Sequence, residues 1–241
     1  MMFIVTPAGV AGLDFRDEAD TVNTLLPALR AQGIEAVVVL LHEGGVQSGP
    51  RAALNACEGG LAGSPLAGIV ARLDDAVDLV VSGHTHAVYI CRLPNAIGRA
   101  LPVTSASAFG RVLTEIDLRI DPARRDIVAV NPTNRLVERD EALLASTGAV
   151  RRLVDGYAAL AAPLAAQVVG AIAADLPAHA VDTACNMPAG ELIADAQRAA
   201  TGADIAFMNR GGVRSPGFTV ASSPAGEGDG RVTYGEAFTV Q

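Results

Sequence analysis

The spacing of apolar residues predicts alternating helices and strands in the first half of the chain. Residues 17–32 carry apolar side chains at helical intervals and stop at Gly33, which predicts a helix that Pro27 is expected to kink. Residues 35–41 are an unbroken run dominated by valine and leucine, typical of a strand covered on both faces. The further elements expected here are a helix at 64–73 and strands at 77–82, 88–93, 101–104, 111–120 and 126–130.

The second half begins with a change of composition near Asn131. Residues 138–166 are rich in alanine and leucine and predict a helical segment, with breaks expected at Gly148, Gly156 and Pro163. The later expected elements are strands at 168–172, 204–208 and 231–233, a helix at 188–201, a loop at 216–230 and a helix from Tyr234. This order indicates a mixed α/β (α+β) protein with a first domain at 1–131, a helical connector at 132–167 and a second domain at 168–241.

Composition narrows the class of protein. Half of the 241 residues are hydrophobic and only 18% are charged, which excludes a disordered chain. The net charge of -8 argues against a general affinity for nucleic acid, because nothing offsets the repulsion of phosphates. The most apolar stretch, residues 158–174, contains Pro163, Gln167 and Gly170 and is too short and interrupted for a membrane span. The first residues lack the basic start of an export signal.

Three histidines follow predicted buried strands and are the strongest candidates for chemistry. His84 and His86 come directly after the strand at 77–82, and His42 occupies the same position after the strand at 35–41. In open α/β sheets ligands bind at the carboxyl ends of the strands, so one sheet can bring these imidazoles together. The sequence therefore predicts a metal site of His42, His84 and His86, with Glu43 either beside it or simply solvated.

A second candidate segment follows the predicted strand at 204–208. Gly211 and Gly212 allow a ligand to approach the backbone closely, although two glycines after a strand are also common in plain turns. Arg214 offers a planar fork that suits phosphate or carboxylate, and Asn209 can hydrogen-bond a sugar or a base edge. These four residues are the expected substrate-binding group.

Taken together, these segments resemble one known family. They are residues 38–45 (VVLLHEGG), 78–86 (DLVVSGHTH), 102–106 (PVTSA), 186–196 (NMPAGELIADA) and 209–214 (NRGGVR). In this order they resemble the bacterial bifunctional 5'-nucleotidase and 2',3'-cyclic-nucleotide phosphodiesterase family of calcineurin-like metallophosphoesterases. The resemblance implies the C-terminal half of a metallophosphoesterase β-sandwich with flanking helices, followed by an incomplete α/β nucleotide-binding domain.

The resemblance also implies an activity, cofactors and roles for particular residues. Members of the family hydrolyse nucleotide phosphoesters with two divalent metal ions such as zinc or manganese, so the expected partner is a small nucleotide. His42 and His84 match two ligands of one metal, and His86 matches a ligand of the other. Asn209 and Arg214 match residues that contact the nucleotide. Family members are usually exported, which implies the periplasm or the cell surface.

Part of the family's catalytic set has no counterpart before His42. The chain contains no Asp-x-His and no Asn-His, and its single Gly-Asp, at 228–229, comes in the wrong order. We therefore expect an internal portion of a nucleotidase, cut at both ends and by itself catalytically inactive, since the catalytic histidine motif is missing. Two further hypotheses stay open: a nucleotide-binding module without chemistry, and a mononuclear zinc hydrolase using His42, His84 and His86.

The cysteines leave one question open. Cys57, Cys91 and Cys185 are too few for a disulfide scaffold. The exported location implied by the resemblance makes Cys57 and Cys91 candidates for one bridge, with two unpaired buried thiols as the alternative. The preferred nucleotide, the metal and the oligomeric state are not determined by the sequence.

Overall fold

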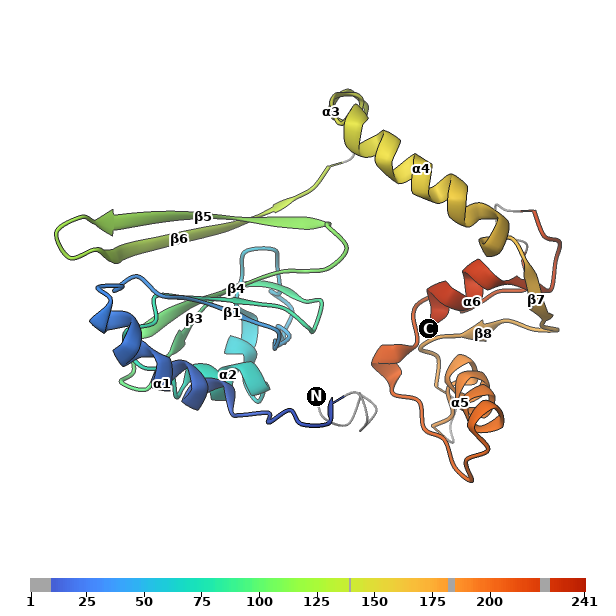
Figure 1. The fold of residues 1–241 in the computed structure, drawn as a ribbon, viewed down its shortest axis with the longest axis horizontal. Coiled ribbons are helices and arrows are strands. Elements are labelled where there is room, and N and C mark those ends of the chain that lie inside the picture. The colour runs from blue at the N-terminus through green and yellow to red at the C-terminus, as the bar shows by residue number, and fades with distance from the viewer. Residues whose placement is uncertain (1–9, 139, 182–184, 222–225) are drawn as a thin grey trace. The chain divides into compact units, whose positions relative to one another are not determined.

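The computed structural model describes residues 10–138, 140–181, 185–221 and 226–241. The chain forms two compact units, residues 1–139 and 140–241, which are drawn in Figure 1 and described one by one below. We call them the N-terminal unit and the C-terminal unit. Of the helical connector expected at 132–167, residues 132–136 are instead the end of a strand of the N-terminal unit, and residues 140–167 fall in the C-terminal unit.

The N-terminal unit is layered. A four-stranded mixed sheet in the order β1-β2-β4-β3 has two helices on one side and a β-hairpin on the other (Figure 1). Strands β1, β2 and β4 are parallel, and β3 is antiparallel to β4. The elements are α1 (Glu18–Ala31), β1 (Val38–Leu41), η2 (Glu58–Leu61), α2 (Pro65–Val70), β2 (Leu79–Ser82), β3 (Val88–Pro94), β4 (Ala100–Ala106), β5 (Val112–Asp121) and β6 (Asp126–Leu136).

The main hydrophobic core of this unit lies between the helices and the sheet. Leu66 and Val70 of α2 and Val80 and Val103 of the sheet are fully buried in it. Helix α2 begins as predicted, because the Ser64 side chain accepts a hydrogen bond from a backbone amide of the first turn. The expected elements of this half are present, with ends shifted by a few residues.

Strand β1 differs from its prediction. It begins at Val38 rather than at residue 35, and it is not covered on both faces, since Leu40 is 79% exposed. Because β1 is the edge strand of the sheet, its outer backbone has no neighbouring strand among the described residues. An apolar run cannot distinguish an edge strand with one open face from a central strand.

The hairpin of β5 and β6 is attached to the sheet through one buried amide. The Asn134 side chain is 2% exposed, and its Nδ2 donates to the carbonyls of Leu54, Tyr89 and Ser105 at 2.9, 3.3 and 3.1 Å. The side chain of Asn55 completes the attachment by pairing with the backbone of Asn134. One residue therefore joins the hairpin, the sheet and the loop after β1.

The C-terminal unit is built from short elements around a smaller core. Its sheets are the antiparallel pairs β7 with β10 and β8 with β9. Ile193 of α5, Phe218 of β9 and Val240 of α6 meet in the core. The elements are α3 (Glu141–Ser146), α4 (Gly148–Ala165), β7 (Val168–Ala171), β8 (Leu176–Pro177), α5 (Pro188–Thr201), η3 (Arg210–Gly212), β9 (Gly217–Phe218), β10 (Arg231–Thr233) and α6 (Tyr234–Val240).

Two expectations for this unit are wrong. Helix α4 runs without a break through Gly156 and Pro163, because one glycine and one proline near the end cost less than interrupting an 18-residue helix. Residues 204–208 are irregular rather than a strand. No described strand lies beside them to pair with, and the Phe207 side chain is 88% exposed. None of the described helices is both long and apolar enough to cross a membrane.

A buried carboxylate joins the residues that precede β1 and β2, and it provides a test by pH. The backbone N–H of Val37 donates to Asp78 Oδ2 at 2.8 Å, and burial raises the pKa of Asp78 above its ordinary 3.8 despite this hydrogen bond. The folded state thus holds the proton more tightly than the unfolded state, so stability falls as pH rises from 3.8 through the raised pKa and then levels off. We expect Asp78→Asn, which keeps the acceptor, to be more stable at pH 7 and to lose this pH dependence.

The measurement is urea unfolding of both proteins at a series of pH values from 3.5 to neutrality. Asp117→Asn, which removes one exposed carboxylate from β5, is the matched control for the change in net charge. A lower stability of Asp78→Asn at pH 7 would show that the carboxylate is needed in its charged form.

Candidate functional site

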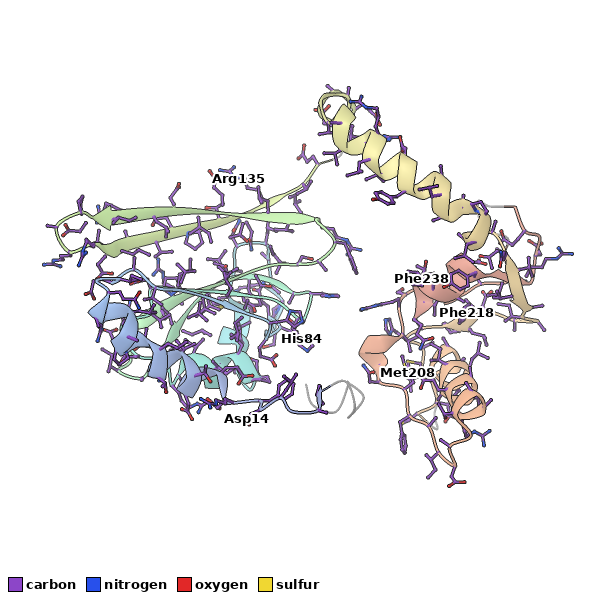
Figure 2. All side chains as sticks on the ribbon, in the orientation of Figure 1. Asp14, His84, Arg135, Met208, Phe218 and Phe238 are labelled. Carbon is purple, nitrogen blue, oxygen red and sulfur yellow. A yellow bond between two sulfur atoms is a disulfide. The ribbon has the colours of Figure 1, made fainter. Side chains whose placement is uncertain are left out.

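The register of the parallel strands brings two of the predicted histidines together. Leu41 at the end of β1 pairs with Ser82 at the end of β2, so the loops that leave the two strands start side by side. The rings of His42 and His84 are edge to face, with 5.1 Å between their centroids and 65° between their planes. Both side chains are exposed to solvent, and His84 is labelled at one end of the sheet in Figure 2.

The two histidine loops interlock through their backbones. The Thr85 hydroxyl donates to the carbonyl of Gly45 at 2.8 Å, and the amide of Gly83 donates to the carbonyl of Glu43 at 3.3 Å. A Cβ at Gly44 would overlap the carbonyl oxygen of Gly83, so only glycine allows this close approach. The interlocking limits how far the His42 and His84 rings can separate.

A buried chain of hydroxyls supports the loops from below. The Ser82 hydroxyl donates to the carbonyl of Thr104 at 2.8 Å, and it therefore accepts from the Tyr89 hydroxyl at 2.6 Å. The Tyr89 oxygen in turn accepts from the amide of Gly45 at 3.4 Å. Sequence reasoning did not find Tyr89, because it carries no signal before the strands are placed in their order, and it included Gly44 only as part of the 38–45 motif.

The third predicted histidine has a different neighbour. The His86 ring lies edge to face with Phe109, with 5.3 Å between the centroids, and the guanidinium carbon of Arg111 lies 5.3 Å from the centre of the same phenyl ring. His84 and His86 both adopt a left-handed backbone conformation, with φ of 65° and 57°. The extended conformation of β2 therefore does not continue through these two residues. The structure thus pairs His42 with His84 and places His86 against an aromatic side chain.

The donors in the described part of the chain do not make up the two-metal site that the resemblance implies. A zinc site needs three or four protein ligands, and the imidazole pair supplies two. The nearest carboxylate in sequence, Glu43, accepts a hydrogen bond from the amide of Gly44 at 2.8 Å. Among the described residues no group of three or more histidine, cysteine, aspartate or glutamate side chains is arranged to hold a metal.

The predicted substrate-binding segment forms a short exposed turn in the C-terminal unit. Asn209 precedes η3, its carbonyl accepts from the amide of Gly212 at 3.0 Å, and its side chain lies against Gly211 and Gly212. The backbone amide of Arg214 donates to the carbonyl of Val240 at 2.7 Å, which anchors the turn to α6. The side chains of Asn209 and Arg214 are exposed and open to a ligand from solvent.

A cavity of about 400 Å³ lies beside this turn. Methionine side chains and small residues form much of its wall, and the arginine that lines it is Arg210 rather than Arg214. Lining residues include Met187, Gly190, Ala194, Phe207, Met208 and Arg210.

Cys57 and Cys91 form a disulfide bond that joins the loop after β1 to strand β3. Of the two alternatives left open by the sequence, the bridge is therefore present and the pair of unpaired thiols is wrong. Cys185 is a free and exposed cysteine.

Comparisons with known proteins found one matching family model, two curated relatives and a solved structure of similar fold. Residues 168–241 match the family model described as the 5'-nucleotidase C-terminal domain. Endonuclease YhcR of Bacillus subtilis is 27% identical over 238 residues, and cell wall protein Lmo0130 of Listeria monocytogenes is 26% identical over 241 residues. The crystal structure of a 5'-nucleotidase precursor from Thermus thermophilus aligns with 94% of this chain at a TM-score of 0.58 and 19% identity, a likeness that concerns the fold.

The chain corresponds to a part of each of these proteins. The two curated relatives match 99% and 95% of this chain, but only 17% and 29% of their own lengths are covered. The T. thermophilus structure is covered over 42% of its length.

Proposed function

We propose that this chain, whose residues 168–241 belong to the 5'-nucleotidase C-terminal domain family, is part of an enzyme that hydrolyses nucleotide phosphoesters. The observation that carries the proposal is the match of this family over the exposed Asn209–Arg214 turn. The paired imidazoles of His42 and His84 in the N-terminal unit support it, because they stand at the strand ends where open α/β sheets bind ligands.

In this proposal the C-terminal unit holds the nucleotide. The Arg214 guanidinium binds the phosphate through parallel N–H donors, and the Asn209 amide hydrogen-bonds the sugar or the base. Gly212 lets the Asn209 amide keep its place beside the turn, since a Cβ at Gly212 would come within 2.5 Å of Met208 Cε and 3.1 Å of Asn209 Oδ1. Binding in this form needs no metal ion.

The N-terminal unit contributes His42, His84 and His86 to the catalytic site. The resemblance implies that these histidines would be among the ligands of two divalent ions, which when bound would polarise a phosphoester and supply a hydroxide. Two neighbouring imidazoles are too few to hold an ion tightly. We therefore propose that this chain by itself releases no phosphate from AMP, and that further ligands complete the site in a longer enzyme.

The test is AMP binding to the 241-residue chain, measured by isothermal titration calorimetry. We expect Arg214→Gln to weaken binding by about tenfold or more, because a charge-assisted hydrogen bond is worth more than about 1.4 kcal/mol. Arg198→Gln, which removes an exposed arginine of α5, is the matched control and is expected to bind normally. Equal binding by Arg214→Gln and the parent chain would contradict the proposal.

A second candidate is a nucleotide-binding module without chemistry, which the incomplete set of metal donors among the described residues favours. The two candidates are separated by assaying a longer polypeptide that includes this chain. With zinc or manganese present, an enzyme releases phosphate from AMP, whereas a binding module binds AMP and releases none.

One curated relative is named a cell wall protein, and we propose an extracytoplasmic location for this chain as well.

A further inference from the structure

Phe109 is held in a position that does not serve the hydrophobic core. Its side chain is 75% exposed, and its backbone has a φ of 60°, a left-handed conformation that is unfavourable for a bulky residue. Strained and exposed aromatic residues cost stability, and they persist where the strain serves a function. The position of Phe109 therefore needs an explanation other than folding.

The turn that carries Phe109 is fixed at both of its ends, on one side beside β3 and on the other to the end of the β5–β6 hairpin. The amide of Ser107 donates to the carbonyl of Ala87 at 2.9 Å, directly after His86. The carbonyl of Arg111 accepts from the amide of Val137 at 2.9 Å. The phenyl ring thus stands on a turn held by the ends of two strands, beside the histidine loop.

Two cationic or polar groups flank the ring. Arg111 lies 5.3 Å from the ring centre in cation–π geometry, and the His86 ring meets the phenyl ring at 68° with 5.3 Å between centroids. Both side chains are exposed, and no ion pair joins Arg111 to a carboxylate in the part of the chain that the structure describes. Although the protein as a whole carries a net charge of -8, the Arg111 guanidinium is therefore available to bind an anion.

We propose that Phe109, His86 and Arg111 form a binding ledge for a nucleobase and the phosphate attached to it. The base stacks on the phenyl ring, and the guanidinium of Arg111 binds the phosphate. This inference rests on the proposed function and deepens it, since it adds a nucleotide subsite in the N-terminal unit. His86 is two residues from His84, whose ring faces His42, so the ledge adjoins the proposed catalytic histidines.

The chemistry of the ledge selects one class of ligand. A purely apolar ligand would leave the Arg111 guanidinium without a charged partner, and a simple anion would leave the Phe109 ring exposed. A nucleotide satisfies both groups at once, because a base presents an aromatic face about one sugar away from a phosphate. The ligand is either a mononucleotide or one nucleotide of a longer strand.

The experiment is titration of the 241-residue chain with AMP, followed by NMR. We expect upfield shifts of the adenine protons from the phenyl ring current and shifts of the Arg111 and His86 side-chain signals. Phe109→Leu, which keeps apolar bulk but loses the ring, is expected to weaken the AMP affinity of the ledge by about tenfold. Phe109→Tyr is expected to bind AMP normally, as is the control Phe15→Leu at another exposed phenylalanine of the same unit.

Further ligands separate the two contributions. Adenosine is expected to bind more weakly than AMP and to be indifferent to Arg111→Gln, whereas AMP binding is expected to fall in that variant. Inorganic phosphate is expected to shift Arg111 without dependence on Phe109. The affinity of the ledge for the dinucleotide ApA, compared with its affinity for AMP, identifies the ligand. Tighter binding of ApA indicates that the ledge binds one nucleotide of a longer strand, and equal binding indicates a mononucleotide.

Normal AMP binding and unchanged adenine shifts in Phe109→Leu would overturn the ledge. The titration is run with Arg214→Gln as the parent chain, so that the turn in the C-terminal unit does not contribute. If AMP perturbs the ledge in this background, and the unsubstituted chain binds AMP no more tightly than Arg214→Gln does, the proposed function fails and the ledge stands. Thermal unfolding checks that the variants are folded, as expected for a side chain that is mostly exposed.

Discussion

Asn134→Ala is expected to lower the free energy of unfolding of the N-terminal unit by about 3 kcal/mol, because three carbonyls lose their side-chain donor at once. The hydrogen bonds to the carbonyls of Tyr89 and Ser105 are buried, and the one to the carbonyl of Leu54 is part-buried. The Thr114 hydroxyl, which donates to Asn134 Oδ1 at 2.6 Å, loses its acceptor as well. A loss of this size is a large share of the stability of an ordinary domain.

Urea unfolding monitored by circular dichroism measures this loss. Asn131→Ala is the matched control, because Asn131 lies on the same strand with its side chain exposed. The control is expected to change stability by less than about 0.5 kcal/mol. If both variants unfold at the same urea concentration as the parent chain, the amide of Asn134 does not hold the hairpin to the sheet. A shift of the Asn134→Ala transition alone confirms that it does.

Removal of the disulfide between Cys57 and Cys91 is expected to cost about 3–4 kcal/mol, because the bond closes a loop across a sequence separation of 34 residues. The loop includes α2, β2 and the turn that carries His84. Freeing it therefore weakens the support of the His42–His84 pair as well as the core, since Cys91 is buried in that core. The variant is the double substitution Cys57→Ala and Cys91→Ala.

The measurement compares the thermal unfolding of this double variant with that of the parent chain, with and without a reducing agent. Cys185→Ala is the control, because this cysteine is exposed and free. Reducing agent is expected to lower the melting temperature of the parent chain and of the control, but not of the double variant. An unchanged melting temperature of the parent chain in reducing agent would mean that the bond adds no stability.

The elements with local start and stop signals were predicted well. Helix α5 begins at Pro188 and ends at Thr201 as predicted, because proline fits the first turn of a helix and Gly202 adopts the left-handed conformation that ends it, with φ of 68°. Helix α1 begins after Asp17, whose side chain accepts from the amide of Asp20 at 3.0 Å. These signals act over three or four residues, so they can be read without a fold.

Strand predictions failed where a partner decides the outcome. The apolar residues at 204–208 have the composition of a strand, but a strand is formed by its neighbours, and the described residues supply none there. The exposed face of β1 was missed for a related reason. The run at 35–41 shows that these residues can form a strand, but not whether another layer lies on each side.

The candidate site shows the same division. The placement of His42 and His84 after two apolar runs was enough to predict that their rings meet, because parallel strands end at one edge of a sheet. Nothing in the sequence indicated that the His86 ring lies beside Phe109, since 23 positions separate the two residues and their meeting depends on the turn between β4 and β5. The role of His86 as a metal ligand stays a prediction.

The amino-acid sequence alone determined the mixed α/β class, the helices with local caps and the likeness of five segments to a nucleotidase family, because propensity, capping and motif identity are properties of neighbouring residues. The tertiary structure alone decided which strand is at the edge, that Asn134 joins three segments, and that Phe109, His86 and Arg111 stand together. These facts depend on hydrogen bonds and contacts between residues far apart in the chain, whose geometry is set only when strand order and register are established.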